Sequence, residues 1–89
     1  MPTVCFTAAL QRFVPASSAR VEATTVAEAL AAVFARQPAL RGYVLDDQGT
    51  LRRHVAAYIN GQPIHDRQHL SDAVGPRDEI YVFQALSGG

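Results

Sequence analysis

The chain has 89 residues, of which 48% are hydrophobic, enough to build one domain with a compact core. Its eight arginines balance eight aspartates and glutamates, and the absence of a basic cluster argues against nucleic-acid binding, which needs clustered cations. No apolar run approaches the roughly 18 residues of a membrane span, and the first residues lack the charged start of a signal peptide. We therefore expect one soluble, cytoplasmic domain that binds neither nucleic acid nor membrane.

The N-terminal residues predict a β-hairpin. Residues 3–8 alternate and contain Val, Cys, Phe and Thr, a strand composition, and Pro15 with the serines after it marks a turn. Residues 19–24 then have the pattern of a short second strand. Cys5 is the only cysteine, so no internal disulfide is possible, and we expect it to be a small strand residue rather than a nucleophile.

A helix is predicted at about 26–36. Thr25 occupies the N-cap position and Glu28 follows three residues later, the pattern of a reciprocal capping box. Pro38 is expected to stop the helix near its last predicted residue. Apolar residues recur at helical spacing and predict one buried stripe, formed by Val26, Leu30, Val33 and Phe34.

The middle of the chain predicts a turn followed by a hairpin. Residues 46–49 contain two aspartates before a glycine, but the remaining ligand positions of a calcium loop are missing, so we interpret them as a solvent-exposed turn. Residues 54–60 form a predicted strand with Val55, Ala57 and Ile59 on one face. Asn60-Gly61 is the favoured two-residue hairpin turn and leads into residues 62–66.

The last third predicts a helical turn around 70–74, a tight turn at 75–78 and a final strand at 79–86. One long helix cannot cover both faces of the resulting sheet, so a single helical layer on one face is the natural solution. The first and last strands are the most apolar, and we expect them side by side and parallel in the sheet centre. The predicted fold is α+β, a β-grasp roll with a mixed sheet of four or five strands on one main helix.

The sequence finishes on Ser87-Gly88-Gly89, directly after the last predicted strand. We expect a domain over 1–86 and a flexible tail over 87–89. Three residues extend about 10 Å at most. Residues without a Cβ can thread a channel too narrow for side chains. Such a tail would present an α-carboxylate, which is inert until it is activated, for instance as an acyl-adenylate.

Taken together, these features resemble the MoaD/ThiS family of ubiquitin-like sulfur carriers over essentially the whole chain. The residues that carry the resemblance are the capped helix, the "YING" hairpin, the "RDEIYVF" last strand and the terminal Gly-Gly. The long segment 40–54 is more similar to carriers of the molybdopterin type and to those serving cysteine synthesis than to the shorter thiamine carrier.

The resemblance implies a carrier rather than an enzyme, with no cofactor bound by the chain itself. In such proteins an adenylyltransferase of the ubiquitin-activating type uses Mg-ATP to adenylate the terminal glycine, here Gly89, which follows Gly88. A sulfurtransferase then converts it to a thiocarboxylate, and the tail delivers sulfur to an acceptor synthase subunit. The alternative is a ubiquitin-like modifier conjugated through Gly89 to lysines of other proteins.

The sequence also contains candidate residues for docking a partner or binding a metal. Leu86, with Ser87 beside it, is the best candidate to dock a partner because it adjoins the tail, whereas Phe6 and Phe83 are either docking or core residues. Arg52, Arg53 and Arg41 form either a basic patch for an acidic partner or a solvated face. His65 and His69 lie four apart, but no carboxyl or thiol completes a metal site, and we predict none. No base, nucleophile and orienting group can be assembled into a catalytic site.

Overall fold

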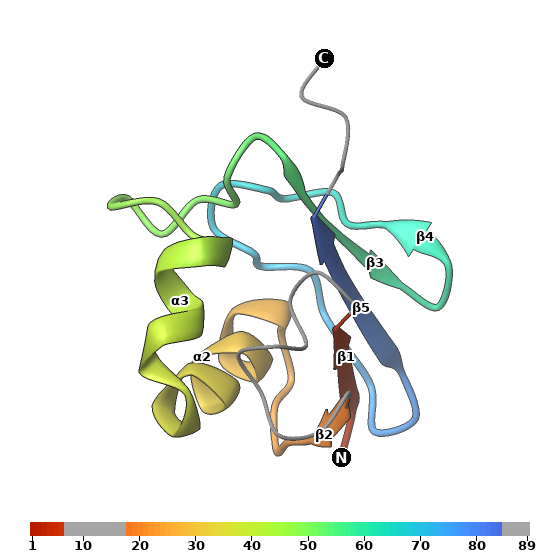
Figure 1. Cartoon of the computed structure of the whole chain (residues 1–89). Coiled ribbons are helices and arrows are strands. Elements are labelled where there is room, and N and C mark those ends of the chain that lie inside the picture. The colour runs from red at the N-terminus through yellow and green to blue at the C-terminus, as the bar shows by residue number, and fades with distance from the viewer. Residues whose placement is uncertain (7–17, 85–89) are drawn as a thin grey trace.

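The computed structural model describes residues 1–6 and 18–84 and shows a five-stranded sheet with two helices packed on one face (Figure 1). The strand order is β2-β1-β5-β3-β4. In chain order the elements are β1 (Thr3–Phe6), β2 (Ser18–Arg20), α2 (Val26–Arg36), α3 (Pro38–Val44), β3 (Val55–Ile59), β4 (Gln62–Pro63) and β5 (Glu79–Gln84). None of these helices has the length and apolar character needed to cross a bilayer.

The predicted parallel pair at the centre of the sheet is confirmed. β1 runs parallel to β5, with Thr3 opposite Glu79 and Phe6 opposite Val82. The other strand pairs are antiparallel. A parallel pair needs a long crossover, and here the connection contains both helices. The α+β, β-grasp prediction is therefore correct, and β5 is the central strand of the sheet, between β1 and β3.

The second strand is shorter than predicted, since β2 ends at Arg20 instead of residue 24. Arg20 lies opposite Thr3, the first residue of β1. The next residue, Val21, still donates from its N–H to the Pro2 carbonyl at 3.0 Å. Pro2 has no N–H to donate in return, so the ladder stops and the chain turns toward α2. The predicted residues 7–8 and 85–86 of the first and last strands lie outside the described part.

Thr25 caps α2 as predicted. Its backbone is extended, with φ −136° and ψ 163°, and its hydroxyl accepts a hydrogen bond from the Glu28 N–H at 3.1 Å. The reciprocal bond differs from a standard capping box, because the Glu28 carboxylate accepts from the N–H and hydroxyl of Thr24, both at 2.8 Å. The carboxylate thus binds one residue before the N-cap.

The helical turn predicted at 70–74 is wrong, because Leu70 has a positive φ of 56° and Ala73 forms an antiparallel bridge with Thr25. The first N–H groups of a helix have no partner within it, and here the segment supplies them. Val26 donates to the Asp72 carbonyl at 3.0 Å and Ala27 donates to the Leu70 carbonyl at 2.9 Å. Val74 in turn donates to the Thr24 carbonyl at 2.9 Å. These backbone groups are therefore unavailable for a local helical turn.

A second helix, α3, was not predicted. Pro38 does stop α2, which ends at Arg36, but it also occupies the first turn of α3. Proline is favoured there because its missing N–H would have no helical partner anyway. Leu40 and Val44 are the buried residues of α3. Their spacing of four residues is the signal in the sequence from which this helix could have been predicted.

The core lies between the helices and the face of the sheet that they cover. The predicted stripe on α2 is confirmed, since all four of its residues are buried. Val55 and Ala57 of β3 are also buried, and Ile59 packs against the core. The central strands contribute the residues that alternate toward the helices, namely Val4, Phe6, Ile80 and Val82.

The hairpin turn at Asn60-Gly61 is confirmed. Both residues have positive φ, 50° and 86°, and Ile59 pairs with Gln62, as a two-residue type I′ turn requires. Residues 46–49 also form a turn, with the Gly49 N–H donating to the Asp46 carbonyl at 3.0 Å. One carboxylate oxygen of Asp46 accepts from the N–H groups of Gln48 and Thr50. That oxygen is thereby used by the turn itself.

Candidate functional site

The site begins where the central strand β5 ends. Gln84 is the last residue of β5 and lies opposite Val55, the first residue of β3. Phe83 lies opposite Ala56. The predicted tail residues Leu86, Ser87, Gly88 and Gly89 lie outside the described residues. β5 therefore ends in the middle of the sheet, at the end where β3 begins.

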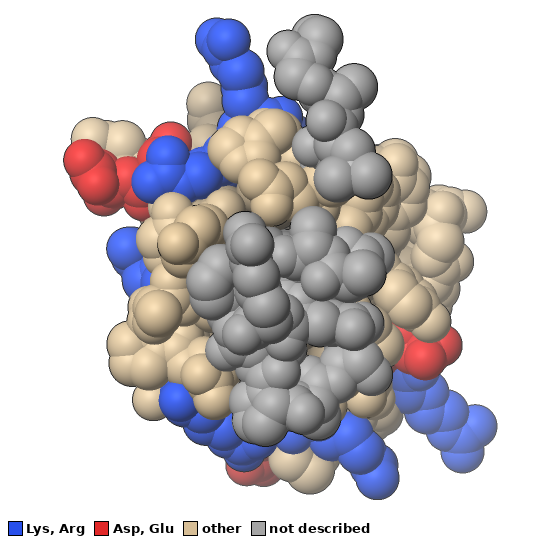
Figure 2. All heavy atoms as spheres, viewed as in Figure 1, with Lys and Arg blue, Asp and Glu red and all other residues tan. Residues whose placement is uncertain are grey.

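Arginines gather at this end of the sheet. Arg52 and Arg53 lie before β3, separated from it by His54, and Arg53 is exposed. The guanidinium of Arg67 donates to the carbonyls of Arg52 at 2.9 Å and Val55 at 2.8 Å. Figure 2 shows Arg side chains at this end, at the top of the view. At this end of the sheet, Arg67 therefore binds the backbone through its hydrogen bonds, and Arg53 is an exposed cation.

Arg52 is tied to α3 rather than free. Its Nε donates to the Gly42 carbonyl at 2.7 Å, and its backbone N–H donates to the Val44 carbonyl at 3.0 Å. Arg41, the third arginine of the predicted patch, is exposed on α3. The structure therefore gives Arg52 a structural role in joining α3 to β3 and leaves Arg53 and Arg41 as exposed cations.

The sheet face away from the helices carries an aromatic cluster of Tyr58, Tyr81 and Phe83. The rings of Tyr58 and Phe83 stack with centroids 5.2 Å apart and planes inclined by 26°. Tyr81 lies directly opposite Tyr58 and is 38% exposed. Neither helix lies on this side of the sheet (Figure 1). The cluster thus forms an aromatic surface, which we call the sheet face, on the strand that leads to the tail.

Sequence reasoning missed Tyr58 and Tyr81. The alternation that places Val55 and Ala57 in the core places Tyr58 on the opposite face, and the same alternation in β5 exposes Tyr81. That signal was present in the sequence. What it could not give is the pairing of β3 with β5, which brings the two tyrosines together.

Phe83 and Phe6, the aromatic docking candidates, differ in position. Phe83 is half-buried on the sheet face by its stacking with Tyr58. Phe6 is only 3% exposed and belongs to the core between the sheet and the helices. Core placement was the alternative considered for both, and it holds for Phe6, whose side chain offers almost no surface to a partner.

Cys5 lies on the sheet face opposite Tyr81, half-buried in β1 as a small strand residue. Burial raises the pKa of its thiol, and the nearby carboxylate of Glu79 raises it further. The Tyr81 hydroxyl donates to that carboxylate at 3.4 Å, and the charge of Glu79 raises the pKa of Tyr81. Both groups therefore stay protonated at neutral pH, which does not favour a thiolate nucleophile. Among the described residues no group of three or more His, Cys, Asp or Glu gathers as a metal site would need.

This strand order, with a central parallel pair and helices on one face, defines a ubiquitin-like β-grasp protein. A solved structure of small archaeal modifier protein 1 from Haloferax volcanii superposes with a TM-score of 0.84 at 30% identity, covering 99% of this chain and 98% of that one. A chain of the Amycolatopsis orientalis BexX/CysO complex superposes with a TM-score of 0.87 over 100% of both chains, at 21% identity, and supports the fold alone.

The chain belongs to the ThiS family, whose model matches residues 4–89. Its resemblance to ubiquitin-like sulfur carriers of the MoaD/ThiS type is confirmed. In sequence, the chain is 35% identical to small archaeal modifier protein 1 of Haloferax volcanii over 65 residues, which are 73% of this chain and 70% of that protein. The chain is therefore a ubiquitin-like protein of the carrier or modifier type.

Proposed function

We propose that the chain is a sulfur carrier whose C-terminal residue in the mature protein is Gly89. Its carboxylate attacks the α-phosphorus of ATP, pyrophosphate leaves, and an acyl-adenylate forms on an adenylyltransferase of the ubiquitin-activating type that supplies the Mg-ATP. Sulfur at the level of sulfide, delivered by a sulfurtransferase, then attacks the acyl carbon, and AMP leaves. The resulting thiocarboxylate delivers sulfur to an acceptor enzyme of molybdopterin or related sulfur-metabolite biosynthesis.

The observation that carries this proposal is the family match, which runs through the tail to Gly89. The position of β5 supports it: the strand ends at Gln84 in the centre of the sheet and is anchored on both sides. The five residues after it extend at most roughly 17 Å. A partner would then bind the folded domain while Gly88 and Gly89 enter a narrow active site.

The sheet face is the surface that the proposed partners would bind. Tyr81 and Phe83 belong to β5 itself, so a protein that binds them holds the strand from which the tail starts. Aromatic side chains are enriched among residues that dominate binding energy. Leu86, which lies beyond the described residues, would extend this surface toward the tail.

Intact mass measurement tests the proposal. The purified protein is incubated with the adenylyltransferase of its own source organism, Mg-ATP and sodium sulfide. We expect a mass increase equal to sulfur minus oxygen, confined to the C-terminal peptide. A variant lacking Gly88 and Gly89 is the matched control: it should show no mass increase and unfold at the same temperature, because two glycines bury almost no surface. An unactivated Gly89 would reject the proposal.

The second candidate function is conjugation to other proteins. It is favoured by the name of the Haloferax volcanii relative, a small archaeal modifier protein. Both functions begin with the same acyl-adenylate and differ in the nucleophile, sulfide in one case and a lysine amine in the other. Adducts of Gly89 with lysines in cell extracts, found without any thiocarboxylate, would favour the modifier over the carrier.

A further inference from the structure

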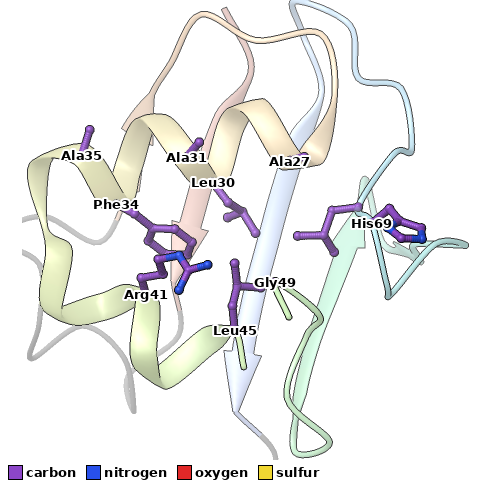
Figure 3. Close-up of a pocket in the computed structure, with 10 residues that line it drawn as sticks. Ala27, Leu30, Ala31, Phe34, Ala35, Arg41, Leu45, Gly49 and His69 are labelled. Carbon is purple, nitrogen blue, oxygen red and sulfur yellow. The ribbon is translucent and has the colours of Figure 1, made fainter. Parts of the chain in front are cut away.

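An apolar groove lies on the helical side of the molecule, away from the sheet face. It encloses about 400 Å³ and runs along α2, with Leu45 and Gly49 across from the helix (Figure 3), and Leu70 also lines it. Its floor is made by side chains that are nearly buried, such as Leu30 at 1% and Phe34 at 8% exposure. The groove is therefore a depression over the core, separate from the end of β5 where the proposed sulfur chemistry takes place.

The rim of the groove on α2 is a row of alanines. Ala27, Ala31 and Ala35 line it at intervals of four residues, so they lie on one face of the helix. At about 1.5 Å per residue the row is about 12 Å long. Ala31 and Ala35 are exposed, at positions where a surface helix ordinarily carries polar side chains. Small side chains here let another backbone approach α2 closely and reach the apolar floor.

Arg41 supplies a cation at one end of the groove. Its side chain points toward Leu30 and Phe34 in Figure 3. No described residue gives its guanidinium a hydrogen bond or an ion pair, and no Asp or Glu lines the groove. His69 lies at the other end with its ring directed away. The groove thus combines an apolar floor with one uncompensated positive charge, which complements an apolar ligand that carries a carboxylate.

The shape and the lining select the kind of ligand. The α2 wall is helical, with its backbone groups bonded within the helix, so it offers no strand edge to which a peptide could add. A straight groove beside a helix, with apolar floor and small-residue rim, fits a second helix that projects apolar side chains at i and i+4. Both helices in the described part of this chain already bury their apolar faces in its own core, so we take the occupant to be a helix of another protein.

We propose that this groove is a docking site for an amphipathic helix of a partner protein, with apolar anchors over Leu30 and Phe34 and a carboxylate paired with Arg41. The site goes beyond the proposed sulfur-carrier function and does not depend on it. Because the helices lie on the side opposite the sheet face (Figure 1), a partner bound here leaves the tail and the sheet face accessible. The chain could then be held by one protein while its tail is used by another.

A display library of 16-residue helical peptides, selected against the full chain, tests the site. We expect selected peptides with an apolar i, i+4 stripe and at least one Asp or Glu. Ala31→Glu should weaken their binding by at least about tenfold, because it fills the rim and repels the carboxylate. Ala39→Glu, which adds the same charge to an exposed position of α3 outside the groove, should leave binding unchanged. Arg41→Gln should weaken acidic peptides several-fold more than their Glu→Gln counterparts.

Three results would overturn the proposal. Peptides that all lose binding to Tyr81→Ser and keep binding to Ala31→Glu would locate binding on the sheet face. A dimer in sedimentation that Ala31→Glu dissociates would make the groove an interface between two copies of this chain. A selection that yields no peptide sensitive to Ala31→Glu would leave the groove without a helical ligand. Since none of these measurements uses Gly89, they are independent of the test of sulfur transfer.

Discussion

The carboxylate of Glu28 binds Thr24, the residue that precedes the N-cap Thr25 of α2. Both the N–H and the hydroxyl of Thr24 donate to it at 2.8 Å, and these bonds lower the pKa of Glu28. Thr25 meanwhile accepts from the Glu28 N–H. The N-terminus of α2 is thus fixed by two consecutive threonines that bind different atoms of one glutamate.

Two double-mutant cycles test this arrangement. Thr25→Ala alone should lower the free energy of unfolding by about 0.5 to 2 kcal/mol, the usual cost of losing an N-cap. Thr24→Val and Glu28→Ala should be less than additive, because each removes the same side-chain contact. Thr25→Ala and Glu28→Ala should be additive, since the Glu28 N–H survives in the alanine variant. Urea unfolding of the single and double variants measures both couplings. Additivity for Thr24 and Glu28, together with coupling between Thr25 and Glu28, would support the standard capping box instead.

Asp66 makes stability depend on acid pH. Hydrogen bonds from the Ser71 hydroxyl and the His69 and Gln68 N–H groups lower its pKa from 3.8 to about 2. The folded state therefore binds this proton less readily than the unfolded state, and the resulting stabilisation is complete above about pH 4. It is lost as the pH falls toward about 2.

The unfolding midpoints of wild type and Asp66→Asn between pH 7 and pH 2 measure this effect. The difference between them should be constant near neutral pH, narrow below about pH 4 and disappear near pH 2. Ser71→Ala removes the largest single cause and should show an intermediate difference. A gap between wild type and Asp66→Asn that persists at the acid end would mean that the charge of Asp66 is not what its hydrogen bonds stabilise.

Asn60 combines a turn conformation with contacts across the sheet. Its φ is 50°, its Nδ2 donates to Asp78 at 2.9 Å, and its Oδ1 accepts from the Glu79 N–H at 2.9 Å. Asn60→Gly keeps the backbone conformation but loses the side-chain bonds, whereas Asn60→Ala loses both. We expect Asn60→Ala to be less stable than Asn60→Gly by about 1 to 2 kcal/mol in chemical denaturation, the cost of a left-handed residue with a Cβ. Equal stabilities of the two variants would mean that Asn60 contributes only through its side-chain hydrogen bonds.

Local signals account for the parts of the fold that the sequence predicts well. The Thr25 cap, the apolar stripe of α2 and the Asn60-Gly61 turn each depend on residues a few positions apart. The parallel central pair followed from the apolar character of the first and last strands and from the crossover between them. The prediction for Gly88 and Gly89 depends on a short motif at the end of the sequence and stays a prediction, because both residues lie outside the described part.

The errors concern interactions between distant segments and one local signal, the spacing of Leu40 and Val44, that was not used. Residues 70–74 form no helical turn, because the carbonyls of Leu70 and Asp72 accept from the N-terminus of α2, more than forty positions away. Pro38 was treated only as the end of one helix, although Leu40 and Val44 needed a second helix to become buried. The sheet face and the groove depend on the pairing of β3 with β5 and on the packing of α2 beside Leu70, and neither can be derived from spacing along the chain.

Tyr81 and Tyr43 allow a controlled test of the sheet face in the proposed activation of Gly89. Both are exposed, by 38% and 46%, but Tyr81 lies on the sheet face beside Phe83 and Tyr43 lies on α3. If the adenylyltransferase grips the sheet face, Tyr81→Ser should raise the KM for the carrier about tenfold in ATP–pyrophosphate exchange. The kcat should stay near wild type, because the carboxylate that reacts is unchanged. Tyr43→Ser should leave both constants as they are.

Because both variants change an exposed tyrosine to serine, an equal effect of the two would reflect a general loss of stability. An effect of Tyr43→Ser alone would locate the activating enzyme on the helical side.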